Sequence, residues 1–246
     1  MSAKFDVVGV IPARYASVRL THKLLRAICG KTLLQWTWEA ARASHVLDKL
    51  IIACDHPEIE KTAKEFGAYV VMTSSSHSSG TDRIAEAVRD IDAKIVINIQ
   101  ADEPLLHPSV IDRLAEEMLS GPNLVMATVK IKLEGEEELH NPNVVKVICD
   151  KDNYAVYFSR LAVPYYRQAD AKDKKYYKHL GIYAYTKDFL YTFKNLPHSY
   201  LEEAEKLEQL RVLEAGYKIR VIETQFDSVG VDTEEDLKRV EAILQK

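Results

Sequence analysis

The stretch at residues 8–25, VGVIPARYASVRLTHKLL, decides the fold class. It begins as an uninterrupted apolar run that stops at Pro12, which is typical of a buried strand in a parallel sheet. It continues as a loop with three cations and no acidic residue: Arg14, Arg19 and Lys23. Because ligands of parallel sheets bind beyond the carboxyl ends of the strands, we expect this loop to face a ligand.

The composition of this loop suits a triphosphate. The arginine side chains offer a fork of donors to phosphate oxygens, and the lysine offers a point charge. Ala13 and Ser17 are small, so backbone amides can approach a phosphate closely. The alternative is a solvated surface loop whose charges are unrelated.

Apolar runs and helical spacing alternate through the rest of the first half. Strands are predicted at residues 5–12, 49–55, 68–73 and 93–100, and helices at 32–44, 58–67 and 81–91. Thr81 is the expected N-cap of the last helix, and Gly67 the glycine that ends the second. This order predicts an α/β fold with a mostly parallel sheet and helices on both faces.

The second half has a different order of elements. We expect two strands around a turn within residues 144–160, a strand at 179–186 and one long helix at 199–216. A strand at 217–224 and a helix at 233–245 follow, the helix opened by a capping box of Thr233 and Asp236. The acidic segment 133–141 is either a subdomain boundary or a solvated loop.

Charge and cysteine content exclude several classes. The formal net charge of −4 argues against nucleic acid as a partner, because binding to a phosphate backbone needs a basic surface. Cys29, Cys54 and Cys149 are far apart in the chain, which predicts reduced thiols in a cytoplasmic protein. The first residues lack a signal-peptide pattern and no apolar run is long enough to span a membrane, so no membrane partner is expected.

Two aspartates are candidate metal ligands. Asp102 follows the strand at 93–100 within QADEP, and Asp232 lies in GVDTEED. Mg²⁺ is usually bound by one or two protein carboxylates together with phosphate oxygens. Helix capping is the alternative role for Asp232. The polar loop at 74–83 feeds a helix N-terminus and could contact a nucleotide base.

The GKT sequence at residues 30–32 is not the end of a P-loop. The pattern G-x-x-x-x-G-K-[ST] requires glycine at position 25, where this chain has Leu25. We therefore expect GKT to start the first helix.

Taken together, these stretches resemble one family from end to end. The 3-deoxy-manno-octulosonate (Kdo) cytidylyltransferases share the ordered series IPARY-x-S-x-R-L…K, SGTDR, Q-x-DEP, NPN-x-VKV, YFSR, KHLGIYAY, LEQLR-x-LE-x-G and GVDTEEDL. The resemblance implies an enzyme that joins CTP to Kdo, releases pyrophosphate and supplies CMP-Kdo for lipopolysaccharide synthesis. It also implies Mg²⁺ as cofactor and a homodimer.

The resemblance further implies a Rossmann-like nucleotidyltransferase fold and a set of site residues. One domain would span 1–246, with a nucleotide and sugar core at about 1–132 and 177–246 and a dimerisation subdomain at about 133–176. The implied catalytic residues are Arg14, Lys23, Asp102 and Asp232, of which Asp102 and Asp232 would hold Mg²⁺. CTP would meet Ala13, Arg14, Ser17, Arg19, Lys23, Ser79, Gly80, Arg83 and Gln100. The sugar acid would meet Arg160, Arg167, His179, Tyr183, Glu208 and Gln209.

The chain departs from the family pattern at two places. The family usually has R-L-P-G-K-P-L, where this chain has RLTHKLL, and QGDEP, where this chain has QADEP. Losing proline and glycine changes the backbone conformations open to the loop, so we hypothesise an intact fold with reduced activity. The alternatives are a cytidylyltransferase for a related acidic sugar (8-amino-Kdo or sialic acid), a non-catalytic CTP-binding relative and a purely structural dimer.

Overall fold

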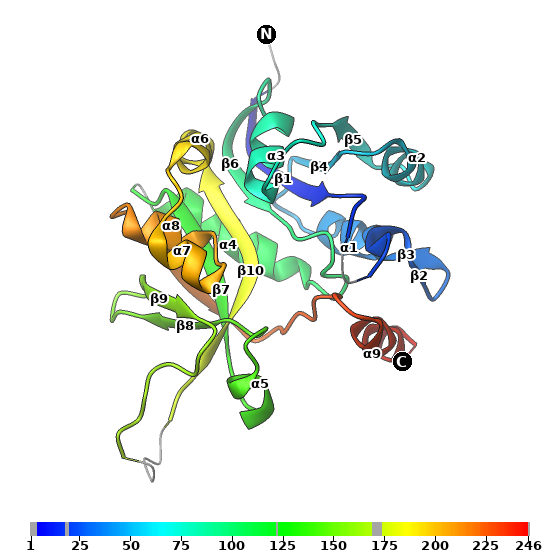
Figure 1. The fold of residues 1–246 in the computed structure, drawn as a ribbon. Coiled ribbons are helices and arrows are strands. Elements are labelled where there is room, and N and C mark those ends of the chain that lie inside the picture. The colour runs from blue at the N-terminus through cyan, green and yellow to red at the C-terminus, as the bar shows by residue number, and fades with distance from the viewer. Residues whose placement is uncertain (1–3, 18–19, 122, 169–173, 246) are drawn as a thin grey trace.

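The main sheet confirms the predicted α/β class. In the computed structural model, which describes residues 4–17, 20–121, 123–168 and 174–245, seven strands follow one path. Their order is β11–β7–β10–β6–β1–β4–β5 (Figure 1). Their bounds are β1 (Lys4–Ala13), β4 (Lys49–Cys54), β5 (Tyr69–Met72), β6 (Asp92–Asn98), β7 (Met126–Lys132), β10 (Tyr177–Thr186) and β11 (Arg220–Thr224).

One strand of this path runs against the others. β1 is parallel to β4 and β6, β4 to β5, and β7 to β11, whereas β10 is antiparallel to both β6 and β7. The carboxyl ends of the parallel strands and the amino end of β10 therefore meet at one edge of the sheet. This edge brings the two halves of the chain together.

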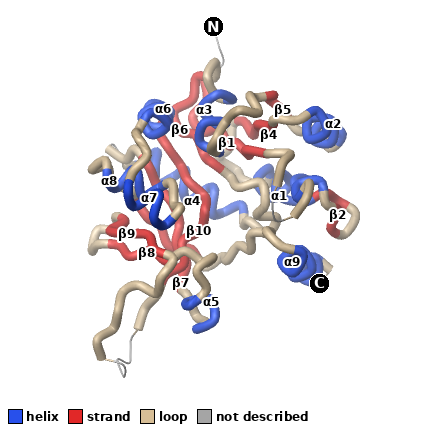
Figure 2. The backbone as a smooth tube through the Cα atoms, in the orientation of Figure 1, coloured by secondary structure: helices blue, strands red, loops and turns tan. Residues whose placement is uncertain are grey.

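Helices cover both faces of the sheet, as predicted (Figure 2). Alternate residues of β1 point to opposite faces, so Ile11 packs in one core and Val10 in the other. The first core includes side chains of α1 (Leu33–Arg42), α2 (Pro57–Glu65), α4 (Pro108–Ser120) and α9 (Glu234–Leu244). The second includes side chains of α3 (Gly80–Ala87), α6 (Lys187–Asn195) and α8 (Gln209–Glu214).

The segment predicted as a subdomain joins the main sheet. It contains α5 (Glu136–His140) and the expected pair of strands, β8 (Lys146–Cys149) and β9 (Ala155–Ser159). β8 pairs with β10 through Lys146 and Lys178, so the hairpin extends from the central sheet. Its role in dimerisation stays a prediction. In the part of the chain that is described, no helix has the length and apolar character to cross a membrane.

Three details differ from the sequence-based expectation. The single helix at 199–216 is wrong: α7 (Tyr200–Glu205) and α8 are separated at Lys206, whose φ of 52° is left-handed. Thr81 is not the N-cap of α3, because Ser79 accepts the capping bond from Asp82 N. The elements α4, β7, α5 and α6 have no counterpart among the predicted ones.

Candidate active site

Lys23 lies between the two predicted metal-binding carboxylates. Its Nζ is 2.6 Å from Asp102 Oδ2 and 2.9 Å from Asp232 Oδ1. Burial opposes the charge of Lys23, but the two carboxylates outweigh this effect and raise its pKa. The structure thus assembles three of the four predicted catalytic residues at one point.

Contacts between distant segments hold this cluster together. Val231 N donates to Asp102 O at 2.9 Å, and Asp232 N donates to Asp236 Oδ2 at 3.1 Å. The capping box of Thr233 and Asp236 is confirmed, so Asp236, and not Asp232, supplies the capping carboxylate. Asp232 is thereby left at the edge of the sheet beside Lys23.

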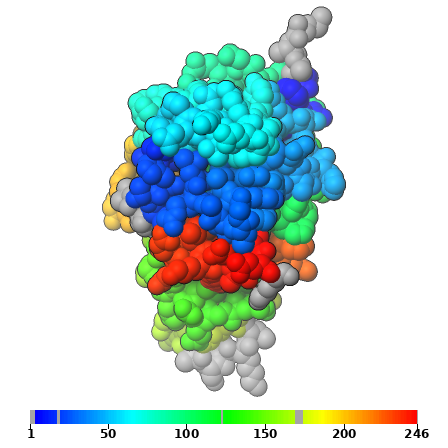
Figure 3. Space-filling model, turned by 90° about the vertical axis from the view of Figure 1, so that its right-hand side faces the viewer, coloured from blue at the N-terminus to red at the C-terminus, as the bar shows by residue number. Residues whose placement is uncertain are grey.

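Helix α9 lies against the segment that contains Lys23. Arg26 pairs with Glu234 at 2.6 Å, and Cys29 Sγ is 4.0 Å from Glu241 O. In Figure 3 the red surface of α9 adjoins the blue surface of the first part of the chain. The end of the described chain therefore packs against the opening loop.

The opening loop folds onto itself before Lys23. Ala13 ends β1 and is buried, and Arg14 follows it half-buried. Ser17 Oγ donates to Leu20 O and accepts from Lys23 N at 3.3 Å. Arg19 lies outside the described residues.

Arg83 is a buried arginine beneath the nucleotide-side loops. Its Nη2 is 2.8 Å from Asp55 Oδ2, and its Nη1 donates to Thr73 Oγ1 at 2.6 Å. Burial lowers the pKa of Arg83, and the like charge of Arg14 adds to this lowering. Arg83 thus fixes the ends of β4 and β5, and its predicted contact with the nucleotide stays a prediction.

The start of α3 and the end of β6 supply the remaining nucleotide-side residues. Gly80 lies close to β1, since a Cβ built on it would be 3.5 Å from Pro12 Cγ. Gln100 Nε2 donates to Asn98 Oδ1 at 3.3 Å. A Cβ on Gly181 would be 3.6 Å from Gln100 Cγ, so β10 passes directly beside this residue.

Glu103 is a carboxylate that sequence reasoning did not assign. Burial and the neighbouring Asp102 raise its pKa to about 7. A Cβ on Gly181 would be 3.7 Å from Glu103 Oε1, so the carboxyl group also borders β10. The sequence feature that could have identified Glu103 as a site residue is its place in the QADEP motif, next to Asp102.

The sugar-side residues on β10 are half-buried. His179 Nε2 is 2.9 Å from Thr128 Oγ1, and burial lowers the pKa of His179 to about 3. The rings of His179 and Tyr183 are 5.4 Å apart. Burial raises the pKa of Tyr183 well above its usual value, so both side chains are neutral near pH 7.

The predicted sugar-side residues beyond β10 do not all converge. Glu208 accepts a hydrogen bond from Thr81 Oγ1 at 2.9 Å, and Gln209 is buried at the start of α8. Arg160 instead donates from Nε to Glu205 O at 2.6 Å and from Nη1 to Pro142 O at 2.8 Å. Arg167 is exposed.

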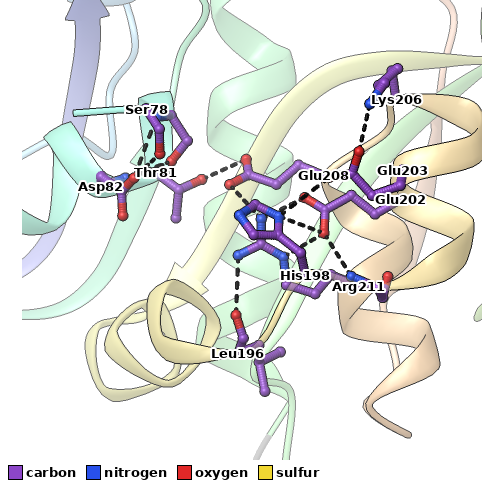
Figure 4. A network of polar contacts seen from close by, with 12 residues as sticks. Ser78, Thr81, Asp82, Leu196, His198, Glu202, Glu203, Lys206, Glu208 and Arg211 are labelled. Carbon is purple, nitrogen blue, oxygen red and sulfur yellow. Dashed lines mark hydrogen bonds and ion pairs between the residues drawn. The ribbon is translucent and has the colours of Figure 1, made fainter. Parts of the chain in front are cut away.

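A cavity of about 510 Å³ lies between the start of α3 and the segment from α6 to α8 (Figure 4). Ser79, Gly80 and Glu208 line it together with charged side chains of both signs. Glu208 and Ser79 therefore border one space, although they are far apart in the sequence.

The two departures from the family pattern have different structural outcomes. His22, where the family usually has glycine, has a left-handed backbone with φ of 50°. Its ring lies 4.2 Å from that of Tyr15, whose other neighbour is His56 at 3.6 Å. Ala101 is buried without a positive φ and accepts a bond from Thr37 Oγ1 at 3.0 Å, so its backbone does not require glycine.

Comparisons with known proteins agree with this arrangement. A family model described as cytidylyltransferase matches residues 8–219. The 3-deoxy-manno-octulosonate cytidylyltransferase of Solibacter usitatus is 46% identical over 239 residues, covering 97% of this chain and 94% of the relative. That of Fusobacterium nucleatum is 47% identical over 234 residues, covering 95% and 94%.

A solved structure supports the same assignment. CMP:2-keto-3-deoxy-manno-octonic acid synthetase, in complex with CTP, has a TM-score of 0.92 to this chain at 39% identity, with 98% of each chain covered. A cytidylyltransferase from Leptospira borgpetersenii, 16% identical with a TM-score of 0.66, shares the fold. The chain therefore belongs to the 3-deoxy-manno-octulosonate cytidylyltransferase family.

Proposed function

We propose that this chain transfers the cytidylyl group of CTP to the anomeric hydroxyl of Kdo, giving CMP-Kdo and pyrophosphate. The observation that carries the proposal is the cluster of Lys23, Asp102 and Asp232 at the carboxyl edge of the sheet. It combines a phosphate-binding cation with a pair of carboxylates, and the relatives named for this reaction match nearly the whole chain.

The donor set fits Mg²⁺. The ammonium of Lys23 is held between one oxygen of Asp102 and one of Asp232, which marks a point where the protein stabilises positive charge. Two carboxylates that leave room for phosphate oxygens are the ligands Mg²⁺ prefers in nucleotide enzymes. Asp102 and Asp232 would hold the ion, which when bound supplies charge neutralisation and lowers the pKa of a hydroxyl group.

The chain's own residues act mainly by position and charge. Arg14 and Lys23 bind the phosphates and stabilise negative charge as the α-phosphorus is attacked in line. The bond from the anomeric oxygen to the α-phosphorus forms, the hydroxyl proton passes to water, and the bond to the bridging oxygen breaks. The electron pair of that bond leaves with pyrophosphate.

The sugar-side residues orient the acceptor. His179 is neutral, so it contributes hydrogen bonds to the sugar and no positive charge. Arg167 is exposed, whereas Arg160 is held by backbone carbonyls. We assign the sugar carboxylate to Arg167.

We further propose a cytoplasmic homodimer that supplies CMP-Kdo for lipopolysaccharide synthesis. Large apolar side chains are exposed on and beside β9 and α7, which supports an interface there. They are Val156, Leu161, Tyr165 and Tyr200. This surface belongs mainly to the segment at 133–176.

Pyrophosphate release from CTP tests the reaction, with Mg²⁺, CTP and Kdo omitted in turn. We expect release only when all three are present, and loss of at least about a hundredfold in Asp102→Asn. Glu234→Gln is the matched control, because its exposed pair with Arg26 lies nearby and outside the cluster.

The acceptor is tested with 8-amino-Kdo and sialic acid in place of Kdo. If either sugar reacts faster than Kdo, that sugar, and not Kdo, is the substrate. Tight CTP binding with no release for any acceptor would establish a non-catalytic relative.

A further inference from the structure

Thr81 connects the nucleotide side of the site to the sugar side. It lies in the first turn of α3, directly after Ser79 and Gly80, and its side chain is buried. Its Oγ1 donates to Glu208 Oε2 at 2.9 Å across 127 residues of sequence. Figure 4 shows the side chains of Thr81 and Glu208 pointing toward each other.

Tyr185, on β10, is a second polar neighbour of Thr81. Burial raises the pKa of Tyr185, and its side-chain hydrogen bonds with Asn98 and Thr81 act in the opposite direction. The side chain of Thr81 therefore borders the central sheet as well as Glu208.

Glu208 has a second stabilising neighbour in Arg211. Arg211 Nη2 is 3.7 Å from Glu208 Oε1, but it donates at 2.5 Å to Glu202 Oε1 and its Nε donates to the same carboxylate. The guanidinium of Arg211 therefore binds mainly to the carboxylate of Glu202. The short hydrogen bond to the Glu208 carboxylate comes from Thr81.

These contacts act on the charge of Glu208. Burial raises the pKa of Glu208 above its usual value, and the hydrogen bonds from Thr81 and Ser79 and the charge of Arg211 limit this rise. The other titratable groups near Glu208 are the tyrosines of β10 and charged side chains of the cavity lining: Glu202, Asp82, Glu203, Lys194, His198 and Lys206. A carboxylate that stays ionised accepts hydrogen bonds from sugar hydroxyls.

We infer that Thr81 is a positioning residue for the sugar acid: its hydroxyl holds the Glu208 carboxylate in the orientation that binds the sugar. The inference rests on the proposed function, because it takes Glu208 to contact the acceptor. Thr81 follows the nucleotide-side residues Ser79 and Gly80 directly.

Steady-state kinetics of Thr81→Val and Thr81→Ser test this role. Valine keeps the shape and removes the hydroxyl, so we expect the KM for Kdo to rise about tenfold, as for one hydrogen bond to a charged group. The KM for CTP should change by less than about twofold, and Thr81→Ser should restore the KM for Kdo. Equal rises in both KM values, or no rise, would overturn the inference.

A double variant shows whether Thr81 acts through Glu208. The KM for Kdo of Thr81→Val combined with Glu208→Gln should equal that of Glu208→Gln alone, because the bond is already lost. If the double variant instead raises the KM for Kdo by the product of the two single effects, Thr81 acts by another route, which would contradict the inference.

A titration separates this inference from the proposed function. In protein labelled with ¹³C-glutamate, the Glu208 carboxyl signal is assigned by its loss in Glu208→Gln. Thr81→Val should move its midpoint to higher pH, and Thr81→Ser should not. If the wild type releases no pyrophosphate with Kdo, the proposed function fails, and this titration still supports or overturns the role of Thr81.

Discussion

His179 is a histidine whose surroundings keep it neutral. Its ring is enclosed by Thr128, Phe158 and Tyr183, and burial lowers its pKa from 6.5 to about 3. The unfolded chain takes up a proton at this residue near pH 6.5, whereas the folded chain does not. The contribution of the neutral His179 to the free energy of unfolding is therefore complete above pH 6.5. This contribution is lost as the pH falls toward about 3.

We expect His179→Gln to reduce this loss of stability in acid. Urea unfolding at about pH 7.5 and about pH 4.5 measures it, as the difference in the free energy of unfolding between the two conditions. His198→Gln is the control, because His198 is 68% exposed. A difference as large in His179→Gln as in the wild type would show that another group controls acid stability.

His22 combines backbone strain with a ring contact. A left-handed conformation costs a residue with a Cβ about 1–2 kcal/mol relative to glycine. The contacts of its ring with Tyr15 offset part of this cost. This explains how the loop keeps Lys23 in place although it lacks the family's Pro-Gly pair.

Two substitutions separate these contributions. His22→Gly and His22→Ala both remove the ring, but only alanine keeps the backbone strain. His22→Ala should therefore be less stable than His22→Gly by about 1 kcal/mol in urea unfolding. Equal stabilities would mean that the loop relaxes out of the left-handed conformation. Turnover of Thr21→Pro with His22→Gly tests the hypothesis that the departures reduce activity.

At the residue scale, the functional side chains could be identified from the sequence more reliably than the contacts that they make. Asp102 was predicted at the edge of the sheet because it follows a strand, and the family resemblance implied that Asp232 joins it in one metal site. That the ammonium of Lys23 lies between them could not be derived, since it depends on the three-dimensional path of the loop. Thr81 was predicted as a cap because it precedes a helical pattern, but its hydroxyl donates to Glu208 at the start of α8.

At the scale of elements, the break between α7 and α8 has an identifiable cause. Leu207 N donates to Glu202 O, Lys206 is left-handed, and Arg160 binds carbonyl oxygens at this point. Arg160 also contacts Pro142 O, so it joins the segment before β8 to the end of α7. Helical periodicity alone does not reveal such a tertiary contact.

Arg160→Lys should therefore lower stability. A lysine ammonium cannot match the separate carbonyl contacts of the guanidinium, so we expect a loss of about 1–2 kcal/mol in urea unfolding. Arg167→Lys, at an exposed position, should change stability by less than about 0.5 kcal/mol and raise the KM for the sugar instead. The reverse pattern would exchange the roles assigned to the two arginines.

The strands of the first half could be predicted because buried parallel strands are continuous apolar runs. The direction of β10 could not, because pairing partners are set by non-local contacts. The apolar pattern at 179–186 is compatible with either direction. The register shows that it is antiparallel to β6, because Tyr183 pairs with Asn98 whereas Thr186 pairs with Ile95.

At the scale of the whole molecule, the exposed apolar side chains predict association. Tyr165 is 89% exposed and Leu161 is 74% exposed, which is costly for a monomer in water. Sedimentation velocity should give a dimer for the wild type, and a monomer for Leu161→Asp combined with Tyr165→Asp. Leu119→Asp, on α4, is the control and should remain dimeric. A monomeric wild type across the micromolar range would contradict the proposed homodimer.

The contact between Lys23 and Asp232 spans 209 residues of sequence. A growing polypeptide presents Lys23 early and Asp232 only after all the intervening strands have been synthesised. During most of its synthesis the nascent chain therefore lacks the paired carboxylates that neutralise this lysine. A premature stop anywhere between them yields a product in which the catalytic cluster is never assembled, however well its first strands have folded.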